Sequence, residues 1–195
     1  MRKLAILTFQ TLDGVMQAPS MPEEDYSGSF QQGGWAAPYW EEVMVQVGEH
    51  AMNKPYDLLL GRKTYDLFEP HWTDPENDGP AARRMREARK YIVTNSPRDF
   101  KWENSHALRG DDLPEEILKL KMTEGPLLQV HGSWQLIQSL LAHDLVDEMR
   151  LWTFPLLVGQ GKRLFETATP GRFELRISDH TANGVRMSLY RKIRA

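Results

Sequence analysis

The sequence contains no cysteine among its 195 residues. A disulfide framework, a thiolate zinc site and a cysteine nucleophile are therefore all excluded. The absence fits a reducing compartment. Stability then has to come from the packing of an apolar core, and a hydrophobic content of 41% is ordinary for a globular protein with such a core.

A large excess of one charge is also lacking. Lys and Arg total 24 and Asp and Glu total 27, so the net charge is −3. This charge is too small to attract a polyanion, and no nucleic-acid partner is expected. Long apolar runs are missing too, because the N-terminal stretch 4–9 is far shorter than a signal-peptide core or a membrane span. A cytoplasmic protein with no membrane partner is expected.

Short apolar runs alternate with helical patterns along the chain. No repeat or Gly/Pro/Ser-rich linker divides it, so one domain covering residues 1–195 is expected. The alternation predicts an α/β fold with a mainly parallel sheet flanked by helices. The predicted strands are residues 4–9, 56–60, 90–94, 127–131 and 149–158. Alternating apolar residues on both sides of Asn183-Gly184 predict an antiparallel C-terminal hairpin.

Helices are predicted between most of these strands. The clearest covers residues 38–52, where Pro38 suits the first helical position and apolar residues recur at helical spacing. The other predicted helices are residues 81–89, a segment after Pro114, and residues 133–143. The 81–89 segment carries four arginines with no aromatic residues between them, which favours a solvated basic face over a nucleic-acid patch.

Residues 16–37 contain five Gly or Pro residues and no periodicity. They predict an irregular loop of unusual length for a compact domain. Loops of this kind commonly bind ligands or close over a site, so this segment is a candidate lid. The alternative is a flexible surface insertion.

Three common site motifs are not matched. After Gly159-Gln160-Gly161, Leu164 stands where the dinucleotide fingerprint has its third glycine. Gly161-Lys162 is followed by Arg163, whereas the Gly-Lys pair of the P-loop motif is followed by Ser or Thr. The six histidines show neither HxH nor HExxH spacing, so no metal site is expected.

A first candidate anion site follows the predicted strand 56–60. Gly61 allows a close turn, and Arg62, Lys63 and Thr64 place two cations and a hydroxyl at the start of a helix. The free N–H groups and the dipole of a helix start favour an anion, and the arginine adds a forked donor. The pattern predicts a phosphate-binding turn, with an ordinary turn and solvated cations as the alternative.

A second candidate follows the predicted strand 127–131. Gly132 allows the backbone to approach a ligand closely, and Ser133 suits a helix cap or a phosphate contact. Two such turns on one sheet suggest a ligand with two phosphate features, such as a dinucleotide. The spacing does not identify that ligand.

Five short motifs, taken in order, resemble the dihydrofolate-reductase-like superfamily, and within it the reductase domains of riboflavin biosynthesis. They span nearly the whole chain. The motifs are Thr11-Leu12-Asp13-Gly14-Val15, Gly61-Arg62-Lys63-Thr64-Tyr65, Val93-Thr94-Asn95-Ser96, Val130-His131-Gly132-Ser133, and Pro155-Leu156-Leu157-Val158-Gly159-Gln160-Gly161 with Leu164-Phe165.

The resemblance implies an enzyme that binds NADPH across the sheet. It places the 2′-phosphate near Arg62 and residues 94–96, and the pyrophosphate between the helix starts at Thr64 and at residues 132–135. The implied cofactor-binding residues are Gly61, Arg62, Lys63, Thr64, Thr94, Asn95, Ser96, Gly132, Ser133, Trp134 and Gln135. The residues implied beside the substrate are Asp13, Gly14 and Phe154.

Asp13 is the candidate catalytic residue in this resemblance, because the first loop of the family covers the nicotinamide. The alternative is a turn residue whose carboxylate binds its own backbone. Dihydrofolate reductases also carry a pterin-binding carboxylate on the following helix. Glu41 and Glu42 occupy the first turn of that predicted helix, where stabilisation of the helix end is the simpler account. A ribityl-pyrimidine or another heterocycle is therefore favoured over folate.

The expected activity is hydride transfer from NADPH to a small heterocyclic substrate. It resembles the 5-amino-6-(5-phosphoribosylamino)uracil reductase step of riboflavin biosynthesis or a dihydrofolate-reductase-like reaction. A homodimer is expected from the same resemblance. Two alternatives stay open: an NADP(H)-binding module without turnover, and a structural dimerisation protein.

Overall fold

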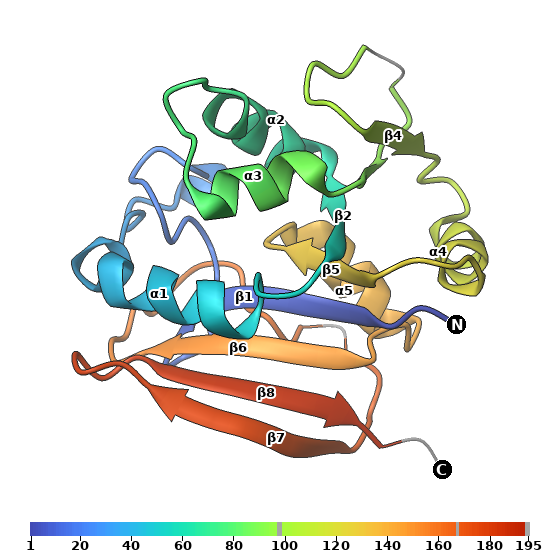
Figure 1. Ribbon diagram of the computed structural model, residues 1–195. Helices are drawn as coiled ribbons and strands as arrows, with labels where there is room; N and C mark the ends of the chain where they lie inside the picture. Colours follow the sequence, from blue (N-terminus) through green and yellow to red (C-terminus); the bar gives the residue numbers. More distant parts are fainter. Residues whose placement is uncertain (97–98, 167, 194–195) are drawn as a thin grey trace.

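The computed structural model describes residues 1–96, 99–166 and 168–193. Within them, eight strands form one mixed sheet in the order β4-β3-β2-β5-β1-β6-β8-β7 (Figure 1). The strands are β1 (Leu4–Thr11), β2 (Tyr56–Gly61), β3 (Lys90–Val93), β4 (Ser105–Leu108), β5 (Leu127–His131), β6 (Glu148–Phe154), β7 (Phe173–His180) and β8 (Arg186–Lys192). Neighbours from β4 to β6 are parallel, and β8 runs antiparallel to β6 and β7. The predicted fold class is confirmed.

Five α-helices lie within the described ranges. They are α1 (Trp40–His50), α2 (Arg62–Trp72), α3 (Pro80–Glu87), α4 (Leu113–Met122) and α5 (Trp134–Ala142). Two short 3-10 helices, η1 (Ser27–Ser29) and η2 (Ala37–Tyr39), precede α1. No helix in the described part of the chain has the length and apolarity needed to cross a bilayer.

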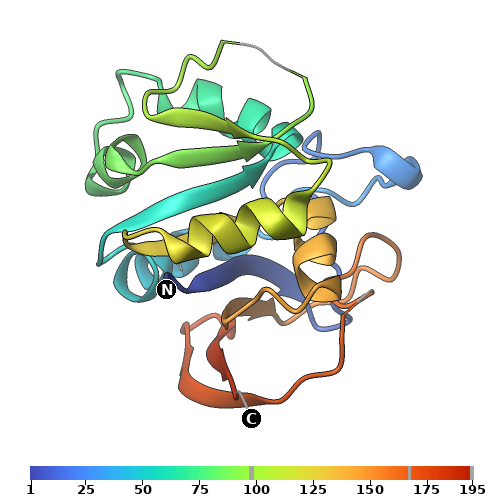
Figure 2. The same cartoon turned by 90° about the vertical axis from the view of Figure 1, so that its right-hand side faces the viewer.

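Helices cover both faces of the sheet, because parallel strands are apolar on both sides. Val47 of α1 and Met85 of α3 belong to the core cluster on one face. Ile117 of α4 and Ile137 of α5 belong to the cluster on the other face, and Figure 2 shows these two helices against that face. The consecutive burial of the residues along β2 follows from this arrangement.

Two strand predictions need correction. Residues 149–158 were predicted as one strand, but β6 ends at Phe154 because Pro155 has no N–H to continue the ladder. The short strand β4 was not predicted at all. It is an edge strand of the sheet, and its Ser-His-Ala-Leu sequence has no apolar run because all four residues are partly or fully exposed.

The segment 16–37 is mostly irregular, as its sequence predicts, but it is packed into the fold. It contains η1 and the start of η2, and the side chains of Met16, Phe30 and Trp35 are buried in the core. The chain also folds tightly on itself here, because a Cβ on Gly33 would lie 2.6 Å from the carbonyl oxygen of Pro22. The glycines and prolines therefore shape a packed segment.

The C-terminal hairpin is confirmed, but the alternation of β7 is interrupted. A bulge between Leu175 and Ile177 shifts the register, so Leu175 pairs with Tyr190 and Ile177 pairs with Leu189. Because successive residues of β8 point to opposite faces, Leu175 and Ile177 also lie on opposite faces of the sheet. The apolar residues Leu175 and Ile177 therefore do not share one face of the sheet.

Candidate functional site

The two predicted anion sites lie side by side at the carboxyl ends of β2 and β5. β2 and β5 are neighbouring parallel strands, and α2 and α5 begin where these strands end. The N–H of Gly61 donates to Oγ of Ser133 at 3.0 Å. Neither helix has a side-chain cap at its start. The first backbone N–H groups of α2 and of α5, which have no partner within their helices, therefore lie close to each other. This arrangement suits a phosphorylated ligand.

The backbone before α5 leaves room for such a ligand. Gly132 and Ser133 have φ values of 57° and 61°, both in the left-handed region. A Cβ on Gly132 would meet no atom within 4 Å. Left-handed backbone at the non-glycine Ser133 costs on the order of 1 kcal/mol and is commonest at functional sites. The open side of Gly132 is thus accessible to a bound group.

Arg62 is oriented by its own helix. Its Nε donates to both carboxylate oxygens of Asp66, at 2.8 and 3.0 Å. The terminal guanidinium nitrogens make no hydrogen bond to any described residue, and the side chain is 30% exposed. They are available to a phosphate oxygen. Lys63 beside it is exposed, and Thr64 is half-buried.

Residues 94–96 form a turn next to the start of α2, because Val93 of β3 pairs with Gly61 of β2. Oγ1 of Thr94 accepts the N–H of Ser96 at 3.1 Å. The side chain of Asn95 accepts the N–H of Gly110 at 2.8 Å and donates to Asp111 at 2.7 Å. Asn95 therefore pins the loop before α4.

Asp13 joins two loops. Its carboxylate accepts the hydroxyl of Thr11 at 2.5 Å and the N–H groups of Gly159 and Val158 at 2.7 and 3.3 Å. The Thr11 hydroxyl bond, followed by the bonds from the backbone, lowers the pKa of Asp13. The side chain is therefore an ionised acceptor at neutral pH. This geometry is that of a turn residue, and a catalytic role stays a prediction.

Two further residues were expected beside the substrate. Gly14 follows Asp13 with φ 82°, and its N–H donates to the carbonyl of Thr11 at 3.0 Å. Phe154 is fully buried, and its ring packs edge-on against Trp35 at 5.1 Å and Tyr39. The ring of Phe154 therefore lies in the core, and its contact with a substrate stays a prediction.

Gln17 organises the segment 16–37 and was not singled out from the sequence. Its Nε2 donates to the carbonyls of Asp25 and Ser27 at 3.1 and 2.9 Å, and its Oε1 accepts the N–H of Lys162 at 3.1 Å. Lys162 also forms an ion pair with Asp25. A lone glutamine in a loop carries no signal of such a role in one sequence.

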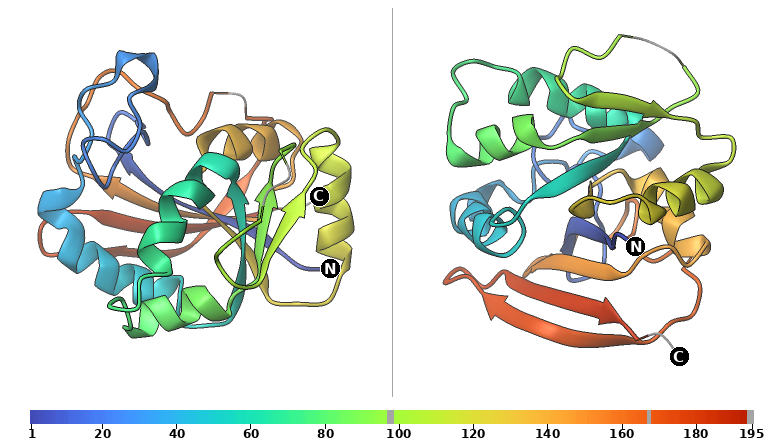
Figure 3. Two further views of the ribbon diagram at one scale, coloured as in Figure 1. Left: turned by 90° about the horizontal axis from the view of Figure 1, so that it is seen from above. Right: turned by 45° about the vertical axis from the view of Figure 1, so that its right-hand side comes forward.

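These contacts hold the segment 16–37 against residues 159–163, as Figure 3 shows from above. Between them lies a cavity of about 520 Å³ that reaches Trp134 at the start of α5. The indole N–H of Trp134 donates to the carbonyl of Arg163 at 2.9 Å. The candidate lid, residues 16–37, thus lies next to the candidate cofactor site at the start of α5. Gln135, at the same helix start, is exposed.

No obvious proton donor lies among the groups described at this edge. Burial, and then the charge of Arg150, lowers the pKa of His131 to about 3, so its imidazole is neutral. Glu42 accepts the N–H of Ala182 at 2.7 Å in the turn of the hairpin, and Glu41 is exposed.

The donors at this edge fit a pyridine dinucleotide phosphate. The starts of α2 and α5 offer backbone N–H groups, Arg62 offers a forked cation, and Gly132 leaves space for close approach. The described residues contain no group of three or more His, Asp or Glu side chains able to hold a metal ion.

Comparison with known proteins identifies the family of this chain. The family model of the RibD C-terminal domain matches residues 2–189. The uncharacterized protein YyaP of Bacillus subtilis strain 168 is 30% identical over 117 residues, which are 58% of this chain and 61% of that protein. The matched stretch thus spans less than two thirds of this relative.

Three solved structures share the fold. A putative riboflavin biosynthesis protein of Shewanella sp. PV-4 has a TM-score of 0.64 at 19% identity, and each chain is covered completely. A dihydrofolate reductase of Enterococcus faecalis, in complex with NADP(H) and RAB-propyl, has a TM-score of 0.62 at 14% identity, with 97% of this chain and 96% of that chain covered. A pyrimidine reductase-like protein of Corynebacterium diphtheriae has a TM-score of 0.58 at 13% identity, with 100% and 93% covered. The chain therefore belongs to the RibD C-terminal domain family and has a dihydrofolate-reductase-like fold.

Proposed function

We propose that this protein is an NADPH-dependent reductase of a small heterocyclic substrate, similar to the 5-amino-6-(5-phosphoribosylamino)uracil reduced in riboflavin biosynthesis. The observation that carries the proposal is the junction at the ends of β2 and β5. There, two uncapped helix starts are joined by the Gly61 to Ser133 hydrogen bond beside the open side of Gly132. Family membership and the NADP(H) bound by a structural neighbour support it.

Each part of this edge has a distinct task in the proposal. The helix starts and Gly132 hold the pyrophosphate, because unpaired N–H groups and the helix dipoles favour an anion. Arg62, fixed by Asp66, and the Thr94 to Ser96 turn hold the 2′-phosphate. Bound NADPH supplies a hydride.

Asp13 acts as a positioning residue in this proposal. As an ionised acceptor it fixes Gly159 and Val158, and so places residues 155–163 beside the segment 16–37. The two segments limit the access of water to the end of β1. A dry site favours hydride transfer because the electrostatic interactions within it are stronger.

Calorimetric titration with NADPH and NADH tests the cofactor. Tighter binding of NADPH is expected, since charge-assisted bonds to the 2′-phosphate contribute about 1.5–3 kcal/mol each. Arg62→Ala is expected to remove most of this preference, whereas Arg83→Ala, on the exposed surface of α3, is the matched control. Equal affinities of the unmodified protein for the two cofactors would contradict the role of Arg62.

Oxidation of bound NADPH tests the reaction. The substrates to compare are 5-amino-6-(5-phosphoribosylamino)uracil and dihydrofolate. Turnover with the pyrimidine and none with dihydrofolate is expected, because Glu42 is occupied in the hairpin turn and Glu41 is exposed. Turnover with dihydrofolate alone would contradict the proposed substrate class.

A second candidate is an NADP(H)-binding module without turnover. It is favoured by the lowered pKa values of Asp13 and His131, which leave neither group as a proton donor at neutral pH. Tight NADPH binding without oxidation by any pyrimidine, pterin or quinone would support this candidate. Mass analysis of the ligand that remains bound to the purified protein would show first whether the junction holds a dinucleotide.

A further inference from the structure

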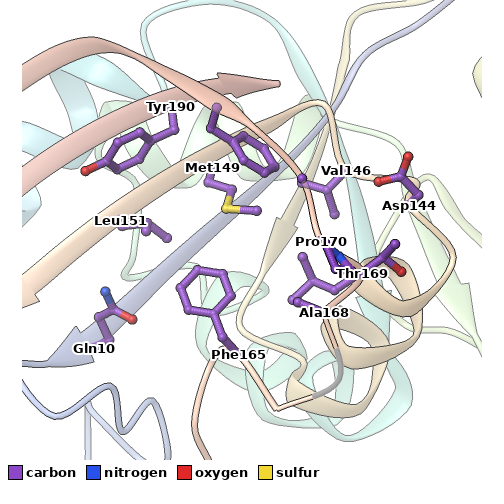
Figure 4. Close-up of a pocket in the computed structure, with 13 residues that line it drawn as sticks. Gln10, Asp144, Val146, Met149, Leu151, Phe165, Ala168, Thr169, Pro170 and Tyr190 are labelled. Atoms are coloured by element: carbon purple, nitrogen blue, oxygen red, sulfur yellow. The ribbon is translucent and has the colours of Figure 1, made fainter. Parts of the chain in front are cut away.

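A cavity of about 550 Å³ lies beside the C-terminal end of α5, whereas the candidate cofactor site lies at the start of that helix. Its lining comes from β1, β6 and β8, from the end of α5 and the turn after it, and from the segment that leads into β7 (Figure 4). We name it the sheet cavity. Its volume lies within the range of about 300–1,000 Å³ that is typical of small-molecule sites.

The register of β6 and β8 sets the floor of the sheet cavity. Met149 of β6 pairs with Tyr190 of β8, so both side chains lie on the same face of the sheet. Leu151 lies two residues along β6 and therefore on that face as well. Figure 4 shows these three side chains lining the cavity. The sheet thus contributes an apolar floor that includes one aromatic ring.

Phe165 and residues 168–171 form a further wall of the sheet cavity. This wall is fixed to the end of α5 through Thr169. The hydroxyl of Thr169 donates to the carbonyl of Ala142 at 2.8 Å, and its N–H donates to the carbonyl of Leu141 at 3.3 Å. The ring of Phe165 remains 52% exposed. The wall therefore belongs to the packed fold, and it presents an aromatic ring that is free for a further contact.

The apolar side chains of the sheet cavity suit a flat aromatic ligand. The rings of Phe165, Phe173 and Tyr190 line it together with the thioether of Met149. Pairs of aromatic rings stabilise a complex beyond the area that they bury, and a thioether sulfur makes favourable contacts with a ring. An aliphatic ligand would gain only the burial of its area.

The charge of the lining favours a neutral ligand. Among the described residues that line the sheet cavity, Asp144 alone has a charged side chain, and it forms an ion pair with Lys192. An ionised ligand would lose its hydration in this apolar space and would find no unpaired counter-charge in the lining. A neutral molecule has no such cost.

Hydrogen-bonding groups lie at one end of the sheet cavity. Gln10 and Tyr190 are both at the end away from Asp144 (Figure 4). The amide nitrogen of Gln10 donates to Oγ1 of Thr153 at 3.2 Å, while its amide oxygen accepts no hydrogen bond from any described residue. The hydroxyl of Tyr190 likewise bonds to no residue in the described ranges. A ligand with one polar group would be oriented toward this end.

We propose that the sheet cavity binds a neutral, flat aromatic molecule with a single polar group. Its ring packs between Phe165 and the floor formed by β6 and β8, and its polar group reaches Gln10 and Tyr190. This site is separate from the junction of α2 and α5, because none of its lining residues takes part in that junction. The proposal therefore does not depend on the proposed reductase activity.

Fluorescence titration of the complete chain with N-phenyl-1-naphthylamine tests the site. This neutral aromatic amine becomes brighter in apolar surroundings, and saturable one-to-one binding to the unmodified protein is expected. Leu151→Trp is expected to abolish binding by filling the cavity. Phe165→Ala is expected to raise the dissociation constant about fivefold or more by removing a ring contact. Val45→Ala is the matched control, since Val45 is an apolar residue of α1 that is 59% exposed.

Phe165→Ala keeps the test valid if Leu151→Trp does not fold, because the side chain of Phe165 is half exposed. No saturable binding to the unmodified protein would overturn the proposal. Binding that Phe165→Ala leaves unchanged would also overturn it, because the dye would then occupy another place.

A second dye tests the charge of the ligand. The anion 8-anilino-1-naphthalenesulfonate has nearly the same ring system and is expected to bind about tenfold more weakly or worse, because its charge has no partner in the cavity. Equal or tighter binding of this anion would refute a site for neutral molecules. Hydrogen exchange with the neutral dye bound is expected to slow in residues 141–146 and 168–171. Slowing confined to residues 16–37 would instead assign the dye to the lid and contradict the proposal.

Discussion

The backbone N–H of Gly61 donates to the side-chain hydroxyl of Ser133 at 3.0 Å, across a sequence separation of 72 residues. This bond ties the end of β2 to the start of α5. It fixes the distance between two helix starts that each leave N–H groups unpaired. A cofactor that spans both starts needs this distance to be constant, since preorganised donors cost no rearrangement on binding.

Ser133→Ala is expected to weaken the junction. The N–H of Gly61 then loses its partner in a partly buried position, which costs about 0.5–1.5 kcal/mol of folding stability. NADPH affinity is expected to fall as well, because α2 and α5 are no longer linked at their starts. Urea denaturation and calorimetry measure the two effects. Ser139→Ala, in the same helix, serves as the control and is expected to leave NADPH affinity unchanged.

The sequence predicts both helix starts of this junction because their signals are local. A buried strand, a glycine and a polar helix start occur within ten residues at Gly61 and again at Gly132. The bond between Gly61 and Ser133 is not local, and no pattern in one sequence indicates it. The same reason explains why Gln17 was missed: its partners Asp25, Ser27 and Lys162 are brought together only by the fold.

Other features escaped prediction because burial departs from the local pattern. The strand β4 has no apolar run because it is an exposed edge. The segment 16–37 is rich in glycine and proline, yet Phe30 and Trp35 are buried in the core. The resemblance implies Phe154 beside the substrate, and the sequence does not indicate that its ring is buried against the rings of Trp35 and Tyr39.

Gly132→Val is expected to block NADPH binding while the protein still folds. The new side chain occupies the open space beside the helix start and also strains the left-handed backbone at φ 57°. Gly184→Val is the control that separates backbone strain from blocked binding. Gly184 also has a left-handed φ, 89°, but it lies in the hairpin turn, away from the junction. Both variants are expected to melt at a lower temperature, and only Gly132→Val to lose affinity. Unchanged affinity in Gly132→Val would remove the α5 start from the proposed cofactor site.

Asp13→Asn tests the positioning role. The pKa of Asp13 is lowered in the folded protein, chiefly by the hydrogen bond from the Thr11 hydroxyl. The carboxylate therefore stabilises the fold at pH values above its ordinary pKa of 3.8. This stabilisation is lost as the pH falls through the lowered pKa. The variant is expected to melt below the unmodified protein at neutral pH, and the difference to shrink in acid. If Asp13 only positions Gly159, the pH profile of turnover keeps its shape in Asp13→Asn. Loss of the acidic or the basic limb of this pH profile would instead indicate that Asp13 takes a direct part in the reaction.

Gln17→Ala is expected to loosen the candidate lid. Without the amide, the carbonyls of Asp25 and Ser27 lose their donor and Lys162 loses its acceptor. Hydrogen exchange of residues 24–31 is expected to accelerate, with little change in β1 or α5. Gln32→Ala, an exposed glutamine of the same segment, is the control. In the unmodified protein, exchange of this segment is expected to slow when NADPH and a substrate analogue bind together, and exchange that is indifferent to both would contradict a lid.

Lys90→Met is expected to reveal a buried cation through the pH dependence of stability. Lys90 is fully buried at the start of β3, where its amine donates to the carbonyls of Arg86 and Glu103 at 2.7 and 3.0 Å and lies 4.4 Å from the ring of Trp102. Burial lowers its pKa from 10.5 to about 8, so the unfolded chain binds more protons than the folded protein between these values.

The stability of the unmodified protein relative to Lys90→Met should therefore rise with pH across that window, by an amount on the order of 1–3 kcal/mol. Below the window the amine is charged in both states, and the difference between the two proteins is expected to be constant. Urea denaturation at several pH values measures this difference, and Lys101→Met, at an exposed lysine nearby, is the control. A difference that stays flat or falls with rising pH would show that the folded environment does not destabilise the charged amine.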